Sequence, residues 1–166
     1  MSRWVVSASI SIVVAGCMPF PRYAYLEETR VVATSGSDEI TTDEIQRAEA
    51  VAADVARTSG MKSGAEEEPG YLEPNRMKSA SLSPPRRFLM AYTGTLRIGL
   101  PLELTLELSD DGKVLYFSLD DPNRGDASPT FARIAEILET RVEAAFPGLA
   151  IVHEAKKIGP IWSLPP

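Results

Sequence analysis

Two strand-like segments with alternating side chains, residues 102–109 and 114–119, constrain the fold of this chain more than any other feature. Apolar and polar residues alternate cleanly in the first, and in the second Leu115, Phe117 and Leu119 alternate with Val114, Tyr116 and Ser118, which is the pattern of a strand with one buried face. The Asp111-Gly112 pair between them predicts a hairpin closed by a two-residue type I′ turn. The register set by this turn brings six apolar side chains onto one face, in the pairs Leu104–Leu119, Leu106–Phe117 and Leu108–Leu115. That face needs a second layer to cover it.

Two segments with helical periodicity can supply that layer, because apolar residues recur in them every three or four positions. The first begins at Thr41, which has capping-box spacing to Glu44, and stops at Gly60. The second has Pro129 in its first helical position and ends before Pro147. The apolar stripes consist of Ile45, Ala48, Ala52 and Val55 in the first helix, and of Phe131, Ile134, Leu138 and Val142 in the second. Each helix therefore has one face to bury.

Three further segments, residues 23–33, 88–93 and 149–155, are predicted as strands. The resulting order is strand, helix, strands, helix, strand. We expect an α+β two-layer sandwich, with both amphipathic helices on one face of a mainly antiparallel sheet of about four to five strands. This order broadly resembles a ferredoxin-like arrangement with an extra strand, a resemblance of fold that says little about function.

Residues 1–17 have the pattern of an export signal. After Arg3 comes an apolar run over residues 4–14, which is too short to span a bilayer but has the length of a signal-peptide core. The run leads into Val14-Ala15-Gly16-Cys17, whose cysteine is the only one in the chain.

This tetrapeptide resembles the lipobox of bacterial lipoproteins. The resemblance implies cleavage before Cys17, a diacylglycerol on its sulfur and an acyl group on the new amino terminus, which together give stable membrane attachment. Because Met18 rather than aspartate follows, the resemblance also implies the outer membrane of a diderm bacterium. The alternatives are an uncleaved N-terminal anchor and an ordinary secretory signal with a coincidental cysteine.

The chain is expected to form one domain, since about 150 residues remain after cleavage of such a signal. A segment rich in Glu, Ser and Pro interrupts this domain and is predicted to be a flexible insertion. The expected divisions are a signal peptide over 1–16, the lipidated cysteine and a short tether over 17–22, the α+β domain over 23–158 with its insertion at 61–85, and an apolar tail over 159–166.

The balance of charges argues against nucleic acid as a partner. The chain has 17 Lys and Arg residues against 23 Asp and Glu, a net charge of −6, whereas nucleic-acid binding needs a basic footprint. The same balance argues against electrostatic docking on anionic lipid. The resemblance to a lipobox instead implies the membrane as a partner, through the lipid on Cys17, and we expect an envelope protein as a further partner.

The sequence offers few groups for catalysis or metal binding. His153 is the only histidine, and we expect it to be a partly exposed residue of the last strand beside Glu154. One histidine and one cysteine cannot build the usual zinc sets, and no G-x-S-x-G motif is present. Residues 121–126 resemble a calcium loop only weakly, because Gly125 replaces an oxygen ligand. We expect no catalytic residue, no cofactor and no metal, and hence no enzyme.

Carboxylates are the remaining candidates for chemistry, because the hairpin register places Glu103 opposite Asp120. Like charges in such positions destabilise a sheet unless the pairing ends there or a cation relieves them. A hydrolase would use Glu103 with Asp120 or Asp121, and it would need both acids in one cleft with separated pKa values.

Three functions remain, ranked in the following order. The first is a non-enzymatic, lipid-anchored envelope protein that binds a protein or envelope component near the outer membrane. The second is a carrier of a lipid or other apolar ligand, and the third is the carboxylate hydrolase. The partner-facing surface is expected on the polar outer face of the sheet and in the tail, at Glu103, Thr105, Glu107, Tyr116 and Trp162. Glu107 is expected to be exposed there, so that its removal costs little stability.

Overall fold

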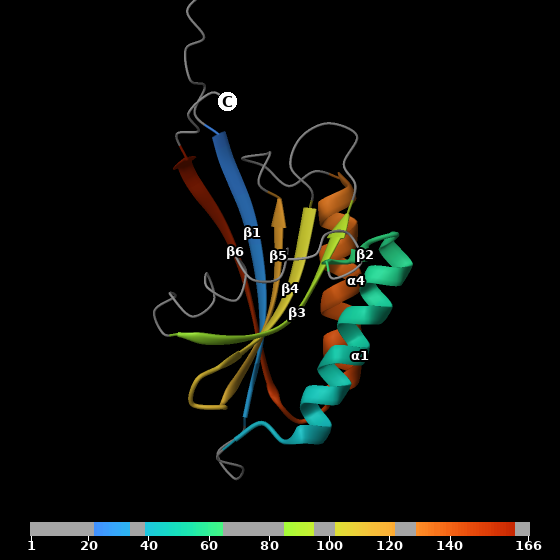
Figure 1. The fold of residues 1–166 in the computed structure, drawn as a ribbon, viewed down its shortest axis with the longest axis vertical. Coiled ribbons are helices and arrows are strands. Elements are labelled where there is room, and N and C mark those ends of the chain that lie inside the picture. The colour runs from blue at the N-terminus through green and yellow to red at the C-terminus, as the bar shows by residue number, and fades with distance from the viewer. Residues whose placement is uncertain (1–21, 34–38, 65–84, 95–101, 122–128, 162–166) are drawn as a thin grey trace, which may run out of the picture.

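The computed structural model of the protein describes residues 22–33, 39–64, 85–94, 102–121 and 129–161. Its elements are, in chain order, β1 (Arg22–Val32), α1 (Thr42–Ser59), β2 (Lys62–Ser63), β3 (Arg86–Gly94), β4 (Leu102–Ser109), β5 (Val114–Asp121), α4 (Pro129–Ala145) and β6 (Ala150–Ile161). The strands form one sheet in the order β2-β3-β4-β5-β1-β6, and each neighbouring pair is antiparallel. Both helices lie on the same side of this sheet (Figure 1). The fold is thus of the predicted α+β class, with helices on one side of an open antiparallel sheet.

The sheet has six strands within the described ranges, against about four to five expected from the two-layer pattern. The additional strand is β2, which pairs with Tyr92 and Thr93 of β3. Two residues are too few to show alternation, so the sequence pattern could not predict this strand. Met61, just before β2, is buried in the core. Residues 61–63 of the insertion expected at 61–85 are therefore part of the folded domain, and most of the remaining prediction falls on residues 65–84, which lie outside the described part of the chain.

The hairpin of β4 and β5 has the predicted register. The opposed pairs are Leu104–Leu119, Leu106–Phe117 and Leu108–Leu115. All six of these side chains are buried in the core. The alternation of the sequence therefore determined both the facing and the pairing of these two strands.

The turn of this hairpin differs from the predicted type I′, which needs positive φ at both central residues. Gly112 has a φ of 70°, but no residue other than glycine has positive φ within the described ranges. Ser109 explains the difference. Its carbonyl accepts from the N–H of Gly112 at 2.9 Å, and its hydroxyl accepts from the N–H groups of Lys113 and Val114 at 3.0 and 2.9 Å. A wider turn centred on the same residues preserves the register.

Both helices begin and end as the sequence predicts. The N–H of Glu44 donates to Oγ1 of Thr41 at 3.3 Å, and the N–H of Thr41 donates to Oε2 of Glu44 at 2.7 Å. This reciprocal pair is the expected capping box. Gly60 ends α1 in the left-handed conformation with a φ of 70°. Pro129 is the first residue of α4.

The core lies between the two helices and the sheet. Its largest fully buried side chains include Phe117, Phe131, Phe146, Leu102, Leu104, Leu106, Leu115, Leu119 and Leu138. The buried residues of α1 are small, namely Ala48, Ala52, Val55 and Ala56. This helix can therefore lie close to its neighbours, and Nη1 of Arg47 donates to the carbonyl of Ala145 at the end of α4, at 3.1 Å.

The ends of the first and last strands differ from the expected domain boundaries. β1 begins at Arg22, which was expected in the tether. β6 runs to Ile161, so residues 159–161 belong to the sheet rather than to an apolar tail. Alternation weakens at Gly159-Pro160, which is why the pattern ended the strand too early. Cys17 and Trp162 lie outside the described residues.

Candidate functional site

The face of the sheet turned away from the helices carries a cluster of charged and polar side chains. We define it as the outer-face network, formed by Glu28 and Arg30 of β1, Arg86 of β3, Glu107 of β4, Tyr116 and Ser118 of β5, and Glu154 of β6. Alternation places these residues there, because Glu107 lies between two buried leucines and Tyr116 lies between the buried Leu115 and Phe117. The register extends the face to β1 and β6, where Glu28 lies opposite both Ser118 and Glu154.

Two arginines connect three carboxylates of this network into a continuous chain. Nη1 of Arg86 lies 2.6 Å from Oε2 of Glu28 and 3.1 Å from Oε2 of Glu107. Nε of Arg30 lies 2.7 Å from Oε1 of Glu28, and Nη2 of Arg30 bonds to Glu154. Glu28 is therefore shared by both arginines and forms the centre of the network.

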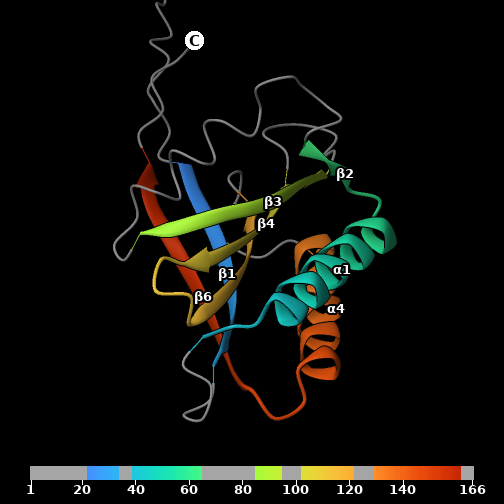
Figure 2. The ribbon, with the colours of Figure 1, turned by 60° about the horizontal axis from the view of Figure 1, so that its bottom comes forward.

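The curvature of the sheet brings these groups together. Arg86 on β3 reaches Glu28 on β1, although β4 and β5 lie between the two strands. In a flat sheet, three spacings of about 4.8 Å would separate the two backbones by about 14 Å. Twist shortens this path by turning the outer strands toward one another. Figure 2 shows β3 lying steeply across the direction of β1 and β6.

Tyr116 lies beneath the arginines. The guanidinium carbon of Arg86 is 3.6 Å from the centroid of the Tyr116 ring, and that of Arg30 is 6.0 Å away. Both distances are within the range of cation–π attraction. Tyr116 is 7 % exposed and Glu107 is 6 % exposed. The expectation that Glu107 is a free surface charge is therefore wrong, because Arg86 covers it and bonds to it.

Glu28 is a fixed negative charge in this network. Burial raises the pKa of its carboxyl, but the hydrogen bonds from Arg86 and Arg30 outweigh this effect, so that the pKa lies below its usual value. The hydroxyl of Ser118 donates a further, long bond of 3.4 Å to Oε2 of Glu28. A carboxylate held in this way can bind a partner or hold neighbouring side chains in place, but it does not exchange protons with a substrate.

Glu103 and Thr105, the other expected surface residues of β4, are half-buried on the same face. Glu103 lies opposite Asp120, as predicted. Asp121 is 0 % exposed and alternates with Asp120, so that it belongs to the opposite face of β5. A hydrolase that combines Glu103 with Asp121 is therefore contradicted, because the sheet separates the two carboxylates.

A second polar cluster lies on the helix side, where β1 and β6 meet α4. Nδ1 of His153 is 3.0 Å from Oγ1 of Thr29 and 3.4 Å from Oε1 of Glu139, and Nε2 is 3.6 Å from Oε1 of Glu143. The imidazole is partly exposed as expected, but it lies on the opposite face of β6 from Glu154. Thr29 is 1 % exposed, so a substrate cannot reach its hydroxyl. The arrangement is not a hydrolase triad.

Glu27 of β1 joins this second cluster. Burial raises the pKa of its carboxyl, and the nearby negative charge of Glu139 raises it further. Within the described ranges, no three His, Cys, Asp or Glu residues are arranged to hold a metal ion. We therefore interpret the cluster as a contact that docks α4 onto β1 and β6.

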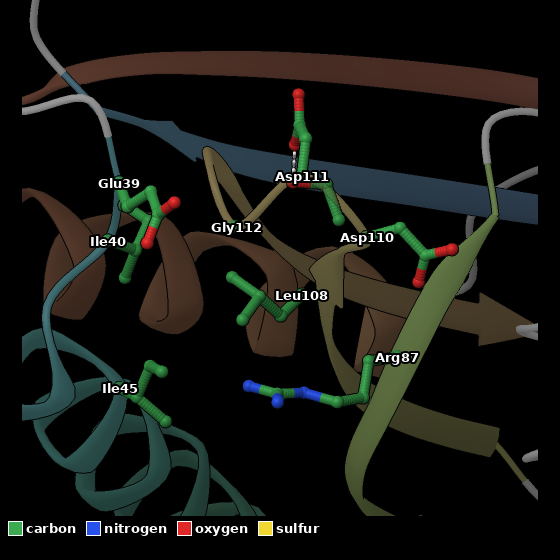
Figure 3. Close-up of a pocket in the computed structure, with 9 residues that line it drawn as sticks. Glu39, Ile40, Ile45, Arg87, Leu108, Asp110, Asp111 and Gly112 are labelled. Atoms are coloured by element: carbon green, nitrogen blue, oxygen red, sulfur yellow. Dashed lines mark hydrogen bonds between the residues drawn. The ribbon is translucent and has the colours of Figure 1, made fainter.

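A pocket of about 270 Å³ lies beside the turn of the hairpin (Figure 3). Ile40, Ile45 and Leu108 contribute its apolar part, and Arg87 extends from β3 toward Ile45. The hydrogen bond from Ser109 lowers the pKa of Asp111, which fixes that carboxylate in the turn. The volume is below the roughly 300–1,000 Å³ of typical small-molecule sites. This pocket is therefore a weak candidate for a small-molecule site.

The sequence interpretation did not find Glu28, Arg30, Arg86 or Glu154 as members of a site. One signal was present in β1, where charged residues at positions 28 and 30 alternate with the buried Thr29 and Val31. This pattern places charges on the outer face, but it does not reveal which distant residues pair with them.

Neither helix within the described ranges is both long enough and apolar enough to cross a membrane. No family model matches the chain, and no match is found among curated proteins or solved structures. The geometry of the molecule itself must therefore carry the functional argument.

Proposed function

We propose that the protein is a non-enzymatic, lipid-anchored binding module of the bacterial cell envelope, held near the outer membrane by a lipid on Cys17. The observation that carries this proposal is the division of the sheet into two faces. The helices cover one face, and the other holds a network of fixed charges centred on Glu28. Arg30 and Glu154 are the more exposed charges of this network, and charges held in fixed positions give specificity for a protein partner through electrostatic complementarity.

The start of β1 supports the membrane-proximal location. Only a few residues separate Cys17 from Arg22, the first residue of the sheet. A tether this short keeps a folded domain close to the bilayer. The partner is then an envelope protein or component at that surface, and the lipobox-like motif is the basis for placing it at the outer membrane.

The partner-facing surface proposed here is the rim of the outer face. Glu103 and Thr105 are half-buried and lie beside the network, whereas Glu107 and Tyr116 form its buried support. Trp162 follows β6 directly in the sequence and is proposed to extend this surface. The network would hold the rim rigid, which lowers the entropic cost of binding.

We also assign the sheet to a ferredoxin-like type of arrangement, extended at one edge by β2 and β3. Its support is the order β4-β5-β1-β6, with α1 between β1 and β4 and α4 between β5 and β6. This assignment concerns the fold alone, because such arrangements host unrelated functions.

A carrier of lipid or another apolar ligand is the alternative function. It requires an apolar cavity of some hundreds of cubic ångströms. The pocket lined by Met61, Leu102 and Ile134 holds about 100 Å³. Within the described part of the chain, the fully buried Phe and Leu side chains that fill the core favour the binding module.

Site-specific photocrosslinking in intact envelopes tests the proposal. A photoreactive amino acid is placed at Glu103 or at Thr105 in the full chain, and a matched control carries it at Glu136, an exposed residue of α4. We expect one protein adduct of the same mass from both outer-face positions and none from position 136. Equal adducts from all three positions, or no adduct from the outer face, would contradict the proposal. Adducts with lipid alone would favour the carrier.

A further inference from the structure

The last strand, β6, forms one edge of the sheet and pairs only with β1 among the described residues. It is 12 residues long, whereas strands usually have about 5–6 residues. Its pairing is regular from Ala150 to Ile158 and is irregular only near its end. An edge strand of this length presents a row of N–H and C=O groups on which another strand can form.

The opposite edge of the sheet is protected. β2 has only two residues, and β3 carries a bulge between Phe88 and Met90. Arg87, which is exposed, adds a charge near its start. Short strands, bulges and charges are the usual means by which proteins prevent edge pairing. β6 is thus the edge better suited to receive a strand.

The hydrogen bonds of the neighbouring strands show which groups of β6 point to the open edge. The N–H of Ala33 donates to the carbonyl of Lys113 at 2.9 Å, which continues the register of β1 with β5. In an antiparallel pair, hydrogen-bonded residues alternate with residues whose backbone groups point the other way. Odd-numbered residues of β1 therefore bond to β5, and even-numbered ones bond to β6. Even-numbered residues of β1 lie opposite even-numbered residues of β6, so the even-numbered residues of β6 bond to β1. The odd-numbered residues of β6 therefore direct their backbone groups to the open edge.

We propose that β6 pairs with β6 of a second copy of this chain, antiparallel, about a two-fold axis at Ala155. In this register Ala155 bonds to its own symmetry mate, and His153 pairs with position 157. These are odd-numbered residues, so the outward-pointing backbone groups of both copies are satisfied. The two sheets become one continuous sheet with an isologous interface.

Charge complementarity selects this register. Glu154 comes opposite the lysine at position 156, twice in each dimer, at non-hydrogen-bonded positions where opposed residues are closest. Val152, which is 45 % exposed, comes opposite the isoleucine at position 158. Moving the axis by one residue would place either Glu154 or position 156 opposite itself. Lysine commonly deters edge pairing, but in this register it favours the pairing.

Cysteine crosslinking of the full chain tests the position of the axis. Cys17→Ser removes the only native cysteine, and Ala155→Cys then adds one at the axis. The Cα atoms of a hydrogen-bonded antiparallel pair are about 5.5 Å apart, within the range of about 4.4–6.8 Å that a disulfide spans. Mild oxidation in a gentle detergent should therefore convert most of this variant into a disulfide-linked dimer.

Val152→Cys in the same background is the matched control. It lies on the same strand and is exposed, but six residues separate it from its symmetry mate's position, or about 20 Å. A dimer from Ala155→Cys and none from Val152→Cys supports the proposal. Equal crosslinking of both variants, or no crosslinking of Ala155→Cys, overturns it.

Charge reversal provides a second test that needs no added cysteine. Lys156→Glu would place like charges opposite each other at two positions, so the dissociation constant of the dimer should rise by about tenfold or more. Lys157→Glu makes the same change of charge at a residue paired with His153, and it should leave the affinity near that of the unmodified chain. Analytical ultracentrifugation measures both. A monomer at every concentration, or equal losses in the two variants, overturns the proposal. Neither test depends on lipidation or on an envelope partner.

Discussion

Removal of Arg86 is the sharpest test of the outer-face network. Arg86→Ala deletes the guanidinium that bonds to Glu28 and Glu107 and that covers Tyr116. Breaking a buried ion pair costs about 3–5 kcal/mol of folding free energy. Glu28 keeps its bond from Arg30, so we expect the lower end, about 3 kcal/mol. This is a large part of the roughly 5–15 kcal/mol that stabilises a typical domain, and it should lower Tm by about 6–12 °C.

Urea unfolding at pH 7 measures this loss against a matched control, Arg87→Ala. Arg87 is the neighbouring arginine of β3 and is exposed, so its removal should change the free energy of unfolding by less than about 0.5 kcal/mol. A loss for Arg86→Ala that is no larger than this would refute the role of the network in stability.

The dependence on pH adds a second criterion. The pKa of Glu28 lies below its usual value in the folded protein. Its bonds therefore contribute stability that is present above the ordinary value of 4.5 and is lost as the pH falls through the folded pKa. The difference in the free energy of unfolding between the parent chain and Arg86→Ala should accordingly become smaller in acid. A difference that stays constant from pH 7 into acid would show that the loss is one of packing rather than of charge.

Four further changes have defined outcomes. Phe117→Ala should cost about 3–5 kcal/mol, because it empties a fully buried core position; a near-neutral result in urea unfolding would place the core elsewhere. Glu107→Ala should cost about 1–3 kcal/mol, because it leaves Arg86 with one carboxylate fewer in a buried site, and a neutral result would mean that the bond contributes nothing. Glu27→Gln should raise Tm at pH 7, because the raised pKa of Glu27 makes its ionised form unfavourable in the folded state; this gain should fade as the pH drops through that pKa toward 4.5. Thermal melts across pH would disprove this reasoning if the gain grew in acid. Cys17→Ala should leave unprocessed precursor without lipid label in envelope fractions, whereas a mature, lipid-labelled variant would rule out the lipobox interpretation.

The hairpin and both helices could be predicted because their signals are local. Alternation fixed the pairing of Leu106 with Phe117, since a slip by one residue would turn the apolar face to solvent. The capping box at Thr41 and the left-handed Gly60 are likewise decided within a few residues. The turn type was wrong because the hydroxyl of Ser109 competes for backbone N–H groups.

The outer-face network could not be predicted because its members are brought together only by the tertiary fold. Arg86 and Glu28 are separated by 58 residues, and they meet because the sheet curves. Alternation correctly placed Glu107 on the outer face, but it treats every polar position on such a face as solvated. A carboxylate on this face is covered only if the curvature of the sheet brings an arginine over it. The sequence of a single strand does not contain the curvature of the sheet.

The position of β1 has a consequence for the time course of folding. It lies between β5 and β6, and its contacts with the last strand, such as that of Thr29 with His153, join residues 124 positions apart. Contacts of such separation form slowly, because the entropy of a long loop is lost before any bond is gained. A chain synthesised from its N-terminus must hold β1 unpaired until β5 has emerged, and β1 then remains an edge until β6 follows. The strand nearest the proposed anchor is therefore among the last to be secured, and late intermediates should expose it to chaperones and proteases.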